Sequence, residues 1–204
     1  MIQPGKIVCV GRNYVEHARE MGNEVPKAPL LFLKPQSSIV FDGEAIVLPR
    51  ASQQVEFEGE IGVVMGARLR NATRTQAESA IGGILALNDV TARDLQRADG
   101  QWTRAKGFDT FCPVGTLAPK PGSLRDIVII TRVNGQERQR ASASAMVFDI
   151  PAILVYISEV MTLQPGDIVA TGTPAGVGPL HAGDVVEIEV AGLSKVSNPV
   201  RGEQ

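Results

Sequence analysis

Residues 56–65 read EFEGEIGVVM, so glutamates alternate with other residues before the chain becomes continuously apolar. In a β-strand successive side chains point to opposite faces, and Glu56, Glu58 and Glu60 would therefore line one face. Carboxylates side by side at the head of a buried strand are costly unless a cation lies between them. The stretch predicts either a hard divalent cation with oxygen ligands or a half-exposed strand whose glutamates face water.

The composition is that of an ordinary globular chain. Its 204 residues are 44% hydrophobic and 21% charged, enough for one domain with a sizeable core. The formal net charge of −2, without a Lys/Arg run, argues against nucleic-acid binding. No apolar stretch reaches the length of a membrane span, and residues 1–6 lack an apolar signal region. We expect a cytoplasmic protein with no membrane or nucleic-acid partner, in which Cys9 and Cys112 are buried small side chains.

The chain is divided into short segments by 13 prolines and 21 glycines, which favours many strands over a helical bundle. The expected fold class is α+β, mainly β, with a few short helices. The patterns predict strands at residues 6–10, 30–33, 84–87, 168–170 and 185–190, hairpins that turn at 42–43 and 134–135, helices at 14–21, 75–82 and 149–161, and a surface loop at 100–109.

Asp89 follows the apolar strand at 84–87 and is a candidate partner for the glutamates. A carboxylate at this strand end would complete an oxygen-ligand set begun by Glu58 and Glu60. Three carboxylates with waters suit Mg²⁺ or Mn²⁺, whereas two histidines and two widely spaced cysteines make zinc a poor candidate. Taken alone, Asp89 has a simpler alternative as the N-cap of a helix that starts near Ala92.

A group of basic and polar residues follows. Around a metal–carboxylate centre such cations would hold a second anionic group of the ligand. The alternative is a solvated basic loop. The group comprises Arg93, Gln96, Trp102, Arg104 and Lys106.

Two further patterns could take part in catalysis or ligand binding. His17 and Glu20 stand three residues apart on one helix face, where a carboxylate would orient the imidazole as a general base. The alternative is an ordinary surface contact. The loop TGTPAGVGP, residues 171–179, lacks the Lys-Ser/Thr ending of a phosphate-binding loop. Its backbone N–H groups and Thr173 could hold a carboxylate, or it is simply a connector dense in turns.

In order along the chain, these segments resemble the fumarylacetoacetate hydrolase family, specifically its small single-domain members of the acylpyruvase type. The resemblance runs from about residue 6 to residue 200, and six segments in register make it specific. They are CVGRNYVEHAREMG (9–22), PLLFLKP (29–35), EFEGEIGVVMG (56–66), NDVTARDLQ (88–96), WTRAKGFDTFCPVG (102–115) and TGTPAGVGP (171–179).

The resemblance implies a mixed β-roll of the fumarylacetoacetase C-terminal type, with residues 1–204 as one catalytic domain that forms a homodimer. It implies one Mg²⁺ or Mn²⁺ held by Glu58, Glu60 and Asp89, with Glu56 as a neighbour. A lid segment at about residues 11–28 would order over the substrate. The implied site roles are water activation by His17 and Glu20, contact with the ligand's oxygens by Lys106, and binding of its carboxylate or shaping of the pocket by Arg12, Arg93, Gln96 and Thr173.

The activity implied by the resemblance is metal-dependent hydrolysis of a C–C bond in 2,4-dioxo acids, of the acylpyruvate or fumarylpyruvate type. The reaction would pass through a metal-chelated 2-oxo acid and a pyruvate enolate. Related sequences imply two alternatives: oxaloacetate decarboxylation or tautomerisation, and isomerisation of 2-hydroxyhepta-2,4-diene-1,7-dioate in aromatic catabolism. His17 and Glu20 favour hydrolysis, because tautomerisation needs no activated water.

A non-catalytic binding module that uses a cation only for stability is the remaining alternative. Full-length fumarylacetoacetases carry a separate N-terminal domain that this sequence does not show, so we expect a substrate other than fumarylacetoacetate. The short loop at residues 97–101 is expected to border the pocket, where its length bears on the size of the acyl group.

Overall fold

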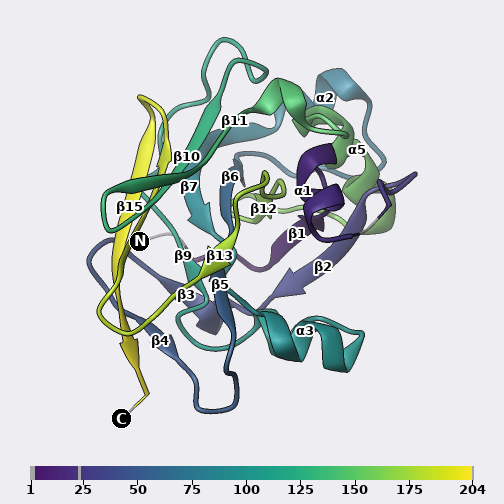
Figure 1. Cartoon of the computed structure of the whole chain (residues 1–204). Coiled ribbons are helices and arrows are strands. Elements are labelled where there is room, and N and C mark those ends of the chain that lie inside the picture. The colour runs from purple at the N-terminus through teal and green to yellow at the C-terminus, as the bar shows by residue number, and fades with distance from the viewer. Residues whose placement is uncertain (1–2, 23, 204) are drawn as a thin grey trace.

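The computed structural model describes residues 3–22 and 24–203 (Figure 1). Residues 1–2 of the N-terminal stretch, residue 23 of the expected lid and residue 204 lie outside the described residues. The fold is mainly β with short helices, which confirms the predicted fold class. The strands form two sheets of five and two smaller sheets of three and two.

The first five-stranded sheet carries the apolar run of the opening sequence. Its order is β2-β1-β12-β6-β7, from β1 (Ile7–Gly11), β2 (Leu30–Lys34), β6 (Gly59–Met65), β7 (Ile81–Asn88) and β12 (Ile168–Ala170). Every residue of β6 is buried, because β12 and β7 flank this strand and apolar side chains cover it. The sheet mixes pairings: β1 runs parallel to β12, whereas the other pairs are antiparallel.

The remaining strands pack around this sheet. The second five-stranded sheet has the order β11-β10-β14-β15-β4, and the smaller sheets are β13-β5-β8 and β3-β9. Their bounds are β3 (Ile39–Val40), β4 (Ile46–Leu48), β5 (Val55–Phe57), β8 (Thr91–Ala92), β9 (Cys112–Pro113), β10 (Val128–Val133), β11 (Gln136–Ser142), β13 (Gly178–Pro179), β14 (Val185–Val190) and β15 (Ser194–Gly202).

The stretch 56–65 is divided at Glu58 between two sheets, because β5 ends before it and β6 starts after it. Around the break, the Glu58 N–H donates to Asn88 Oδ1 at 2.9 Å and the Glu58 carbonyl accepts from the Asp89 N–H at 2.8 Å. The residue after the break, Gly59, must be glycine, because a Cβ at this position would lie 2.0 Å from Thr131 Oγ1. The break fixes the acidic segment to the end of β7.

One predicted hairpin is confirmed and the other is wrong. Asn134 and Gly135, with φ of 52° and 77°, join β10 to β11 as predicted. The turn at residues 42–43 exists, but its flanks do not pair with each other: β3 pairs with β9 and β4 pairs with β15. Instead, the Gly43 N–H donates to the Ser197 carbonyl at 2.9 Å, so the turn docks on β15.

The predicted helices occur with shifted ends, as α1 (Val15–Glu20), α2 (Arg74–Ser79) and α5 (Ile150–Val160). Helices α2 and α5 lie side by side at one end of the molecule, with α3 (Arg93–Asp99) towards the other (Figure 1). Two short 3-10 helices are also present, η1 (Gln36–Ser38) and η2 (Ala143–Ala145). The predicted surface loop at 100–109 is wrong, because it contains α4 (Thr103–Lys106), in which Ala105 and Lys106 are buried.

Both cysteines are fully buried free thiols, as predicted. Burial raises the pKa of both, that of Cys112 to about 12. Among the helices of the described ranges, none is long and apolar enough to cross a membrane.

Candidate metal centre

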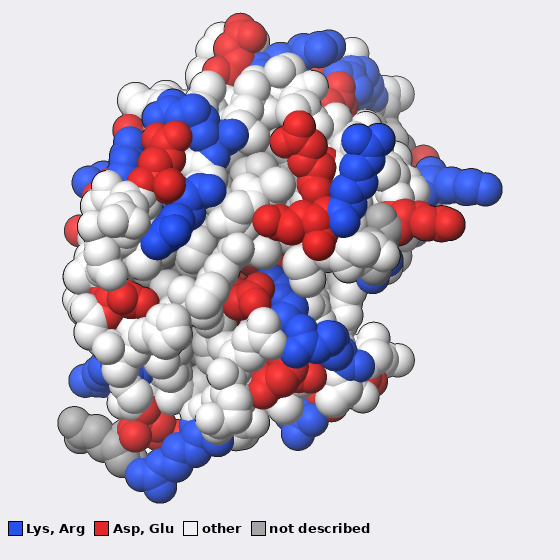
Figure 2. Space-filling model, viewed as in Figure 1, with Lys and Arg blue, Asp and Glu red and all other residues white. Residues whose placement is uncertain are grey.

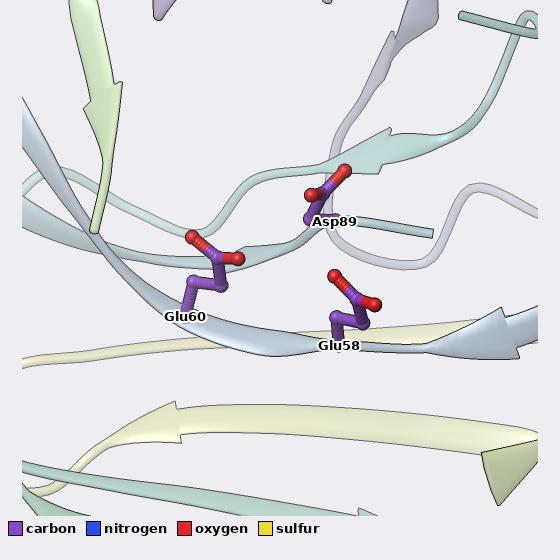
Figure 3. Close-up of side chains that lie close together, drawn as sticks. All are labelled: Glu58, Glu60 and Asp89. Atoms are coloured by element: carbon purple, nitrogen blue, oxygen red, sulfur yellow. The ribbon is translucent and has the colours of Figure 1, made fainter. Parts of the chain in front are cut away.

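Three buried carboxylates converge at the junction of β6 and β7. Glu58, Glu60 and Asp89 are 4%, 2% and 0% exposed, and each offers an oxygen within 4.8 Å of the others. Figure 3 shows Glu60 on β6 and Glu58 just before that strand, both pointing towards Asp89 on the neighbouring segment. The pairing of Gly59 with Asn88 sets this geometry. Glu58 and Glu60 flank Gly59 and Asp89 follows Asn88, so the pairing brings the three carboxylates together. The alternative of a water-facing strand is therefore wrong.

Two buried lysines bond to the carboxylates. Lys106 Nζ donates to Glu58 Oε2 at 2.8 Å, Asp89 Oδ2 at 2.6 Å and Thr91 Oγ1 at 2.8 Å. Lys34 Nζ donates to Asp89 Oδ1 at 2.6 Å. Asp89 is not a helix cap, since Ala92 is the N-cap of α3 and makes no side-chain cap bond.

Arg93 joins the acidic strand to α3. Its Nε donates to Glu56 Oε2 at 2.8 Å, its Nη2 to Glu58 Oε1 at 2.6 Å and its Nη1 to Gln96 Oε1 at 2.7 Å. The solvated basic loop is therefore wrong for Arg93 and Lys106, each 2% exposed, but it does describe Arg104, which forms a surface ion pair with Asp99. Glu56 is neutralised by Arg93 and stands apart from the three converging carboxylates.

The cluster holds four buried carboxylates and three buried cations, and Glu60 is the carboxylate without a cationic partner within the described chain. Among the described residues, Glu60 accepts a hydrogen bond from the Gly172 N–H alone, at 2.7 Å. Burial, Asp89 and Glu58 raise the pKa of Glu60 well above its usual range. Burial alone would raise the pKa of Glu58 too, but Lys106 and Arg93 outweigh it and hold that pKa below its usual range.

The Tyr14 hydroxyl is a buried polar group that feels the charge of Glu60. Among the described side chains it is buried without a hydrogen-bond partner, and burial followed by the charge of Glu60 raises its pKa. Excess negative charge, three convergent oxygens and an unpartnered hydroxyl nearby suit a hard divalent cation. The residues present therefore fit Mg²⁺ or Mn²⁺.

A cavity of about 230 Å³ opens onto the carboxylates. Its size suits a small ligand, since drug-sized pockets occupy roughly 300–1,000 Å³. Glu20 is the predicted site residue that does not line it. Nine predicted residues do: Arg12, His17, Glu58, Glu60, Asp89, Arg93, Gln96, Lys106 and Thr173.

His17 and Glu20 are more than a surface contact. His17 is 5% exposed, and its Nδ1 lies 3.4 Å from Glu20 Oε2. Both Glu20 oxygens in turn accept the Gly176 N–H, at 3.1 Å. This arrangement anchors α1 with the imidazole against the cavity.

The glycine-rich segment holds two of the protein's own carboxylates, because the Gly172 N–H reaches Glu60 and the Gly176 N–H reaches Glu20. It lies beside α1 because β1 and β12 are parallel, so the segments that follow them leave the same edge of the sheet. Gln139 fixes it from β11: Nε2 donates to Thr173 Oγ1, and Oε1 accepts the Gly59 N–H.

The sequence patterns do not single out Lys34, Gln139 or Tyr14. They place Arg97 in the short loop at residues 97–101 that is expected to border the pocket, whereas in the structure Arg97 lines the cavity from α3. Lys34 ends an apolar strand and lysine is usually exposed, so the sequence indicates only the end of that strand. Its signal was the alternation of β2, which puts Lys34 on the same face as the cavity-lining Phe32. Arg97 stands four residues after Arg93 on α3, which places both on one helix face.

One family model matches almost the whole chain. The fumarylacetoacetate (FAA) hydrolase C-terminal family model matches residues 6–201. Oxaloacetate tautomerase fahd-1, mitochondrial, of Caenorhabditis elegans is 43% identical over 188 residues, covering 89% of this chain and 88% of that protein.

Two solved structures share the fold. The 2-hydroxyhepta-2,4-diene-1,7-dioate isomerase from Mycobacterium marinum has a TM-score of 0.91 at 45% identity, covering 99% of this chain and 76% of that one. Fumarylpyruvate hydrolase from Pseudomonas aeruginosa, in complex with Mn²⁺ and pyruvate, has a TM-score of 0.92 at 32% identity, covering 98% of this chain and 91% of that one. The chain belongs to the fumarylacetoacetate hydrolase family.

Proposed function

We propose that this protein is a divalent-metal-dependent enzyme of 2-oxo acids, and that it hydrolyses a C–C bond in 2,4-dioxo acids of the acylpyruvate or fumarylpyruvate type. The observation that carries the proposal is the His17–Glu20 pair: His17 lines the cavity onto which Glu58, Glu60 and Asp89 open, and Glu20 lies behind it at 3.4 Å from Nδ1. The fumarylpyruvate hydrolase in complex with Mn²⁺ and pyruvate supports both the metal and the substrate class.

Glu58, Glu60 and Asp89 would hold one Mg²⁺ or Mn²⁺. The bound cation would act as a Lewis acid that draws electrons from the 2-oxo group. His17 would take a proton from water: Nδ1 faces Glu20, which fixes the tautomer and leaves Nε2 as the accepting nitrogen.

Lys106 would stabilise negative charge that develops on the substrate's oxygens. Burial lowers its pKa, but Asp89 and Glu58 more than offset this and keep the pKa above its usual range, so the ammonium stays charged. Its three N–H groups are all bonded, to Glu58, Asp89 and Thr91, so it must exchange one bond to reach a ligand. The proposed substrate contacts are Arg12, Arg93, Gln96 and Thr173, which all line the cavity.

The first test is a thermal shift with oxalate, a mimic of the pyruvate enolate. Oxalate should raise the melting temperature only when Mg²⁺ or Mn²⁺ is present, because ligand binding to the folded state stabilises it. A non-catalytic module instead predicts that the cation stabilises the protein and that no 2-oxo acid adds to the effect.

The second test is cleavage of acetylpyruvate with Mg²⁺. The wild type should release pyruvate, whereas His17→Ala should lose cleavage and keep metal binding. Retained cleavage in that variant would refute the role of His17 in activating water.

Oxaloacetate tautomerisation or decarboxylation is the second candidate, favoured by the named activity of the relative from Caenorhabditis elegans. Isomerisation of a dienoate in aromatic catabolism is favoured in the same way by the structure from Mycobacterium marinum. Neither tautomerisation nor isomerisation needs activated water, so each should survive His17→Ala. One preparation assayed against 2-oxo and 2,4-dioxo acids separates the candidates.

Four further proposals concern the protein as a whole: residues 1–204 act as one catalytic domain, residues 11–28 act as a lid, the protein is cytoplasmic, and it forms a homodimer. Strand β2 supports the dimer, because it is an edge of its sheet and exposes Leu30 and Leu33. Sedimentation equilibrium tests the dimer. Reduced proteolysis of residues 11–28 when oxalate and Mg²⁺ are bound would support the lid.

A further inference from the structure

Two arginines that line the cavity, Arg12 and Arg97, form no ion pair within the described chain. Because they are more exposed than the carboxylates, the part of the cavity that they line is called the outer end, and the part at Glu58, Glu60 and Asp89 the inner end. Arg12 is half-buried, has a φ of 58° and lies with its guanidinium 6.0 Å from the centre of the Trp102 ring. Arg97 is exposed and donates through Nη2 to the neutral Gln54 Oε1 at 2.6 Å. Both line the cavity, so their charges face the space that a ligand would enter.

The cations at the inner end differ in this respect. Arg93 and Lys106 bond to Glu56, Glu58 and Asp89, so the protein already balances their charges. An anionic ligand group would gain more from Arg12 and Arg97, which carry positive charge without a carboxylate partner among the described residues.

Helix α3 sets the distance between the two ends. Arg93, Gln96 and Arg97 stand at positions i, i+3 and i+4, so one helix face carries all three towards the cavity. Four residues advance an α-helix by about 6 Å. Arg97 therefore stands one helical turn from Arg93, which is paired with Glu56 and Glu58. A short dicarboxylate can cover this span. Figure 2 shows Lys and Arg atoms gathered over α3.

An aromatic wall connects the two ends. Phe32 and Trp102 meet edge to face with centroids 5.2 Å apart, and Lys106 Nζ lies 5.9 Å from the Trp102 ring. Since Arg12 lies 6.0 Å from the same ring, Trp102 contacts a cation of each end. With a divalent cation held by the carboxylates, the cavity would be positively charged at both ends with an aromatic wall between them. This form suits a small molecule with an anionic group at each end.

We propose that Arg97, supported by Arg12, is a specificity-determining residue that holds a distal carboxylate of the substrate. The protein would then prefer dicarboxylic 2-oxo acids to monocarboxylic acylpyruvates. This inference rests on the proposed function, because the 2-oxo carboxylate must bind at the inner end for the second carboxylate to reach Arg97.

The test compares two ligands of equal chain length, 2-oxoglutarate and 2-oxopentanoate, which differ in the distal carboxylate. Dissociation constants are measured by calorimetry with Mg²⁺ for the wild type and for Arg97→Gln. We expect the wild type to bind 2-oxoglutarate about tenfold more tightly, as a charge-assisted hydrogen bond at a partly exposed site would give. Arg97→Gln should remove this preference and leave 2-oxopentanoate unchanged.

Arg104→Gln is the matched control, because Arg104 is an exposed arginine on the neighbouring α4, pairs with Asp99 and does not line the cavity. It should retain the preference, and Arg97→Lys should restore part of it. Equal binding of both ligands by the wild type, or equal weakening of both by Arg97→Gln, would overturn the inference while leaving the proposed function intact. If neither ligand binds in the presence of Mg²⁺, the proposed function fails and the inference with it.

Discussion

The inner and outer ends of the cavity are both rich in charge, but the charges are paired within the described chain only at the inner end. At the inner end, every carboxylate except Glu60 bonds to a buried lysine or arginine, and these side chains are almost inaccessible to water. At the outer end, Arg12 and Arg97 are half-buried or exposed and meet neutral or aromatic partners. The inner end is fixed by its own bonds, whereas the outer end is available to a ligand.

This difference suggests a division of labour. A buried cluster whose cations are all paired moves little and suits the step that needs fixed geometry. Cations at the rim can exchange water for a ligand group at low cost, and they suit selection among substrates. Substitutions at the inner end should therefore affect metal binding and turnover, and substitutions at the outer end should affect the choice of ligand.

The largest expected effect comes from Glu58→Gln and Glu60→Gln. Each removes one of the three converging carboxylates, so each should abolish stabilisation by Mg²⁺ and lower activity on the order of 1,000-fold. Their stabilities in chelator should differ. Glu58→Gln leaves Arg93 and Lys106 short of a partner, which costs about 3 kcal/mol or more, whereas Glu60→Gln removes a carboxylate that had no cationic partner.

Chemical denaturation in EDTA measures this contrast. Glu60→Gln should be at least as stable as the wild type there, and Glu58→Gln clearly less stable. Equal destabilisation by the two substitutions would contradict the view that Glu60 is the uncompensated carboxylate.

A smaller effect is expected for Lys34→Met. This change removes the bond to Asp89 Oδ1 but keeps a side chain of similar volume. Because a residue that orients a metal ligand typically contributes 10–100-fold, metal affinity or turnover should fall by roughly that factor.

Lys6→Met is the matched control for Lys34→Met. It breaks the ion pair of Lys6 with the buried Asp167, and neither residue lines the cavity. The control should lower the melting temperature without changing metal affinity. A loss of metal affinity in the control equal to that in Lys34→Met would mean that general destabilisation, rather than Asp89, explains both.

The smallest expected effect belongs to Gln54, which bridges the two ends. Its Nε2 donates to Glu56 Oε1 at 2.7 Å and its Oε1 accepts from Arg97. Gln54→Met should leave metal affinity unchanged and weaken 2-oxoglutarate binding roughly two- to fivefold, since Arg97 would lose the bond that holds it in place. A large loss of metal affinity would show that the two ends are not independent.

Strand alternation and the position of Asp89 are local signals that made the carboxylates candidates for convergence. These signals left a half-exposed strand and a helix N-cap open, and the resemblance to the family selected Glu58, Glu60 and Asp89. The sequence could not predict which charges would be buried together. Lys34 and Lys106 lie 55 and 17 residues from Asp89 along the chain, and only tertiary packing brings the three side chains into contact. Local signals failed in the same way at residues 42–43, whose flanking strands pair with distant partners rather than with each other.

The parallel pairing of β1 with β12 also bears on the order of folding. Strands β6 and β7 are near neighbours in the chain, whereas Ile7 and Ile168 must meet across most of its length. Contacts between distant segments form slowly, because the intervening chain loses entropy when its ends are joined. We expect pulse-labelled hydrogen exchange to protect β6 and β7 before β1 and β12. The carboxylates would then gather early in folding, and the walls formed by the two distant segments would enclose them last.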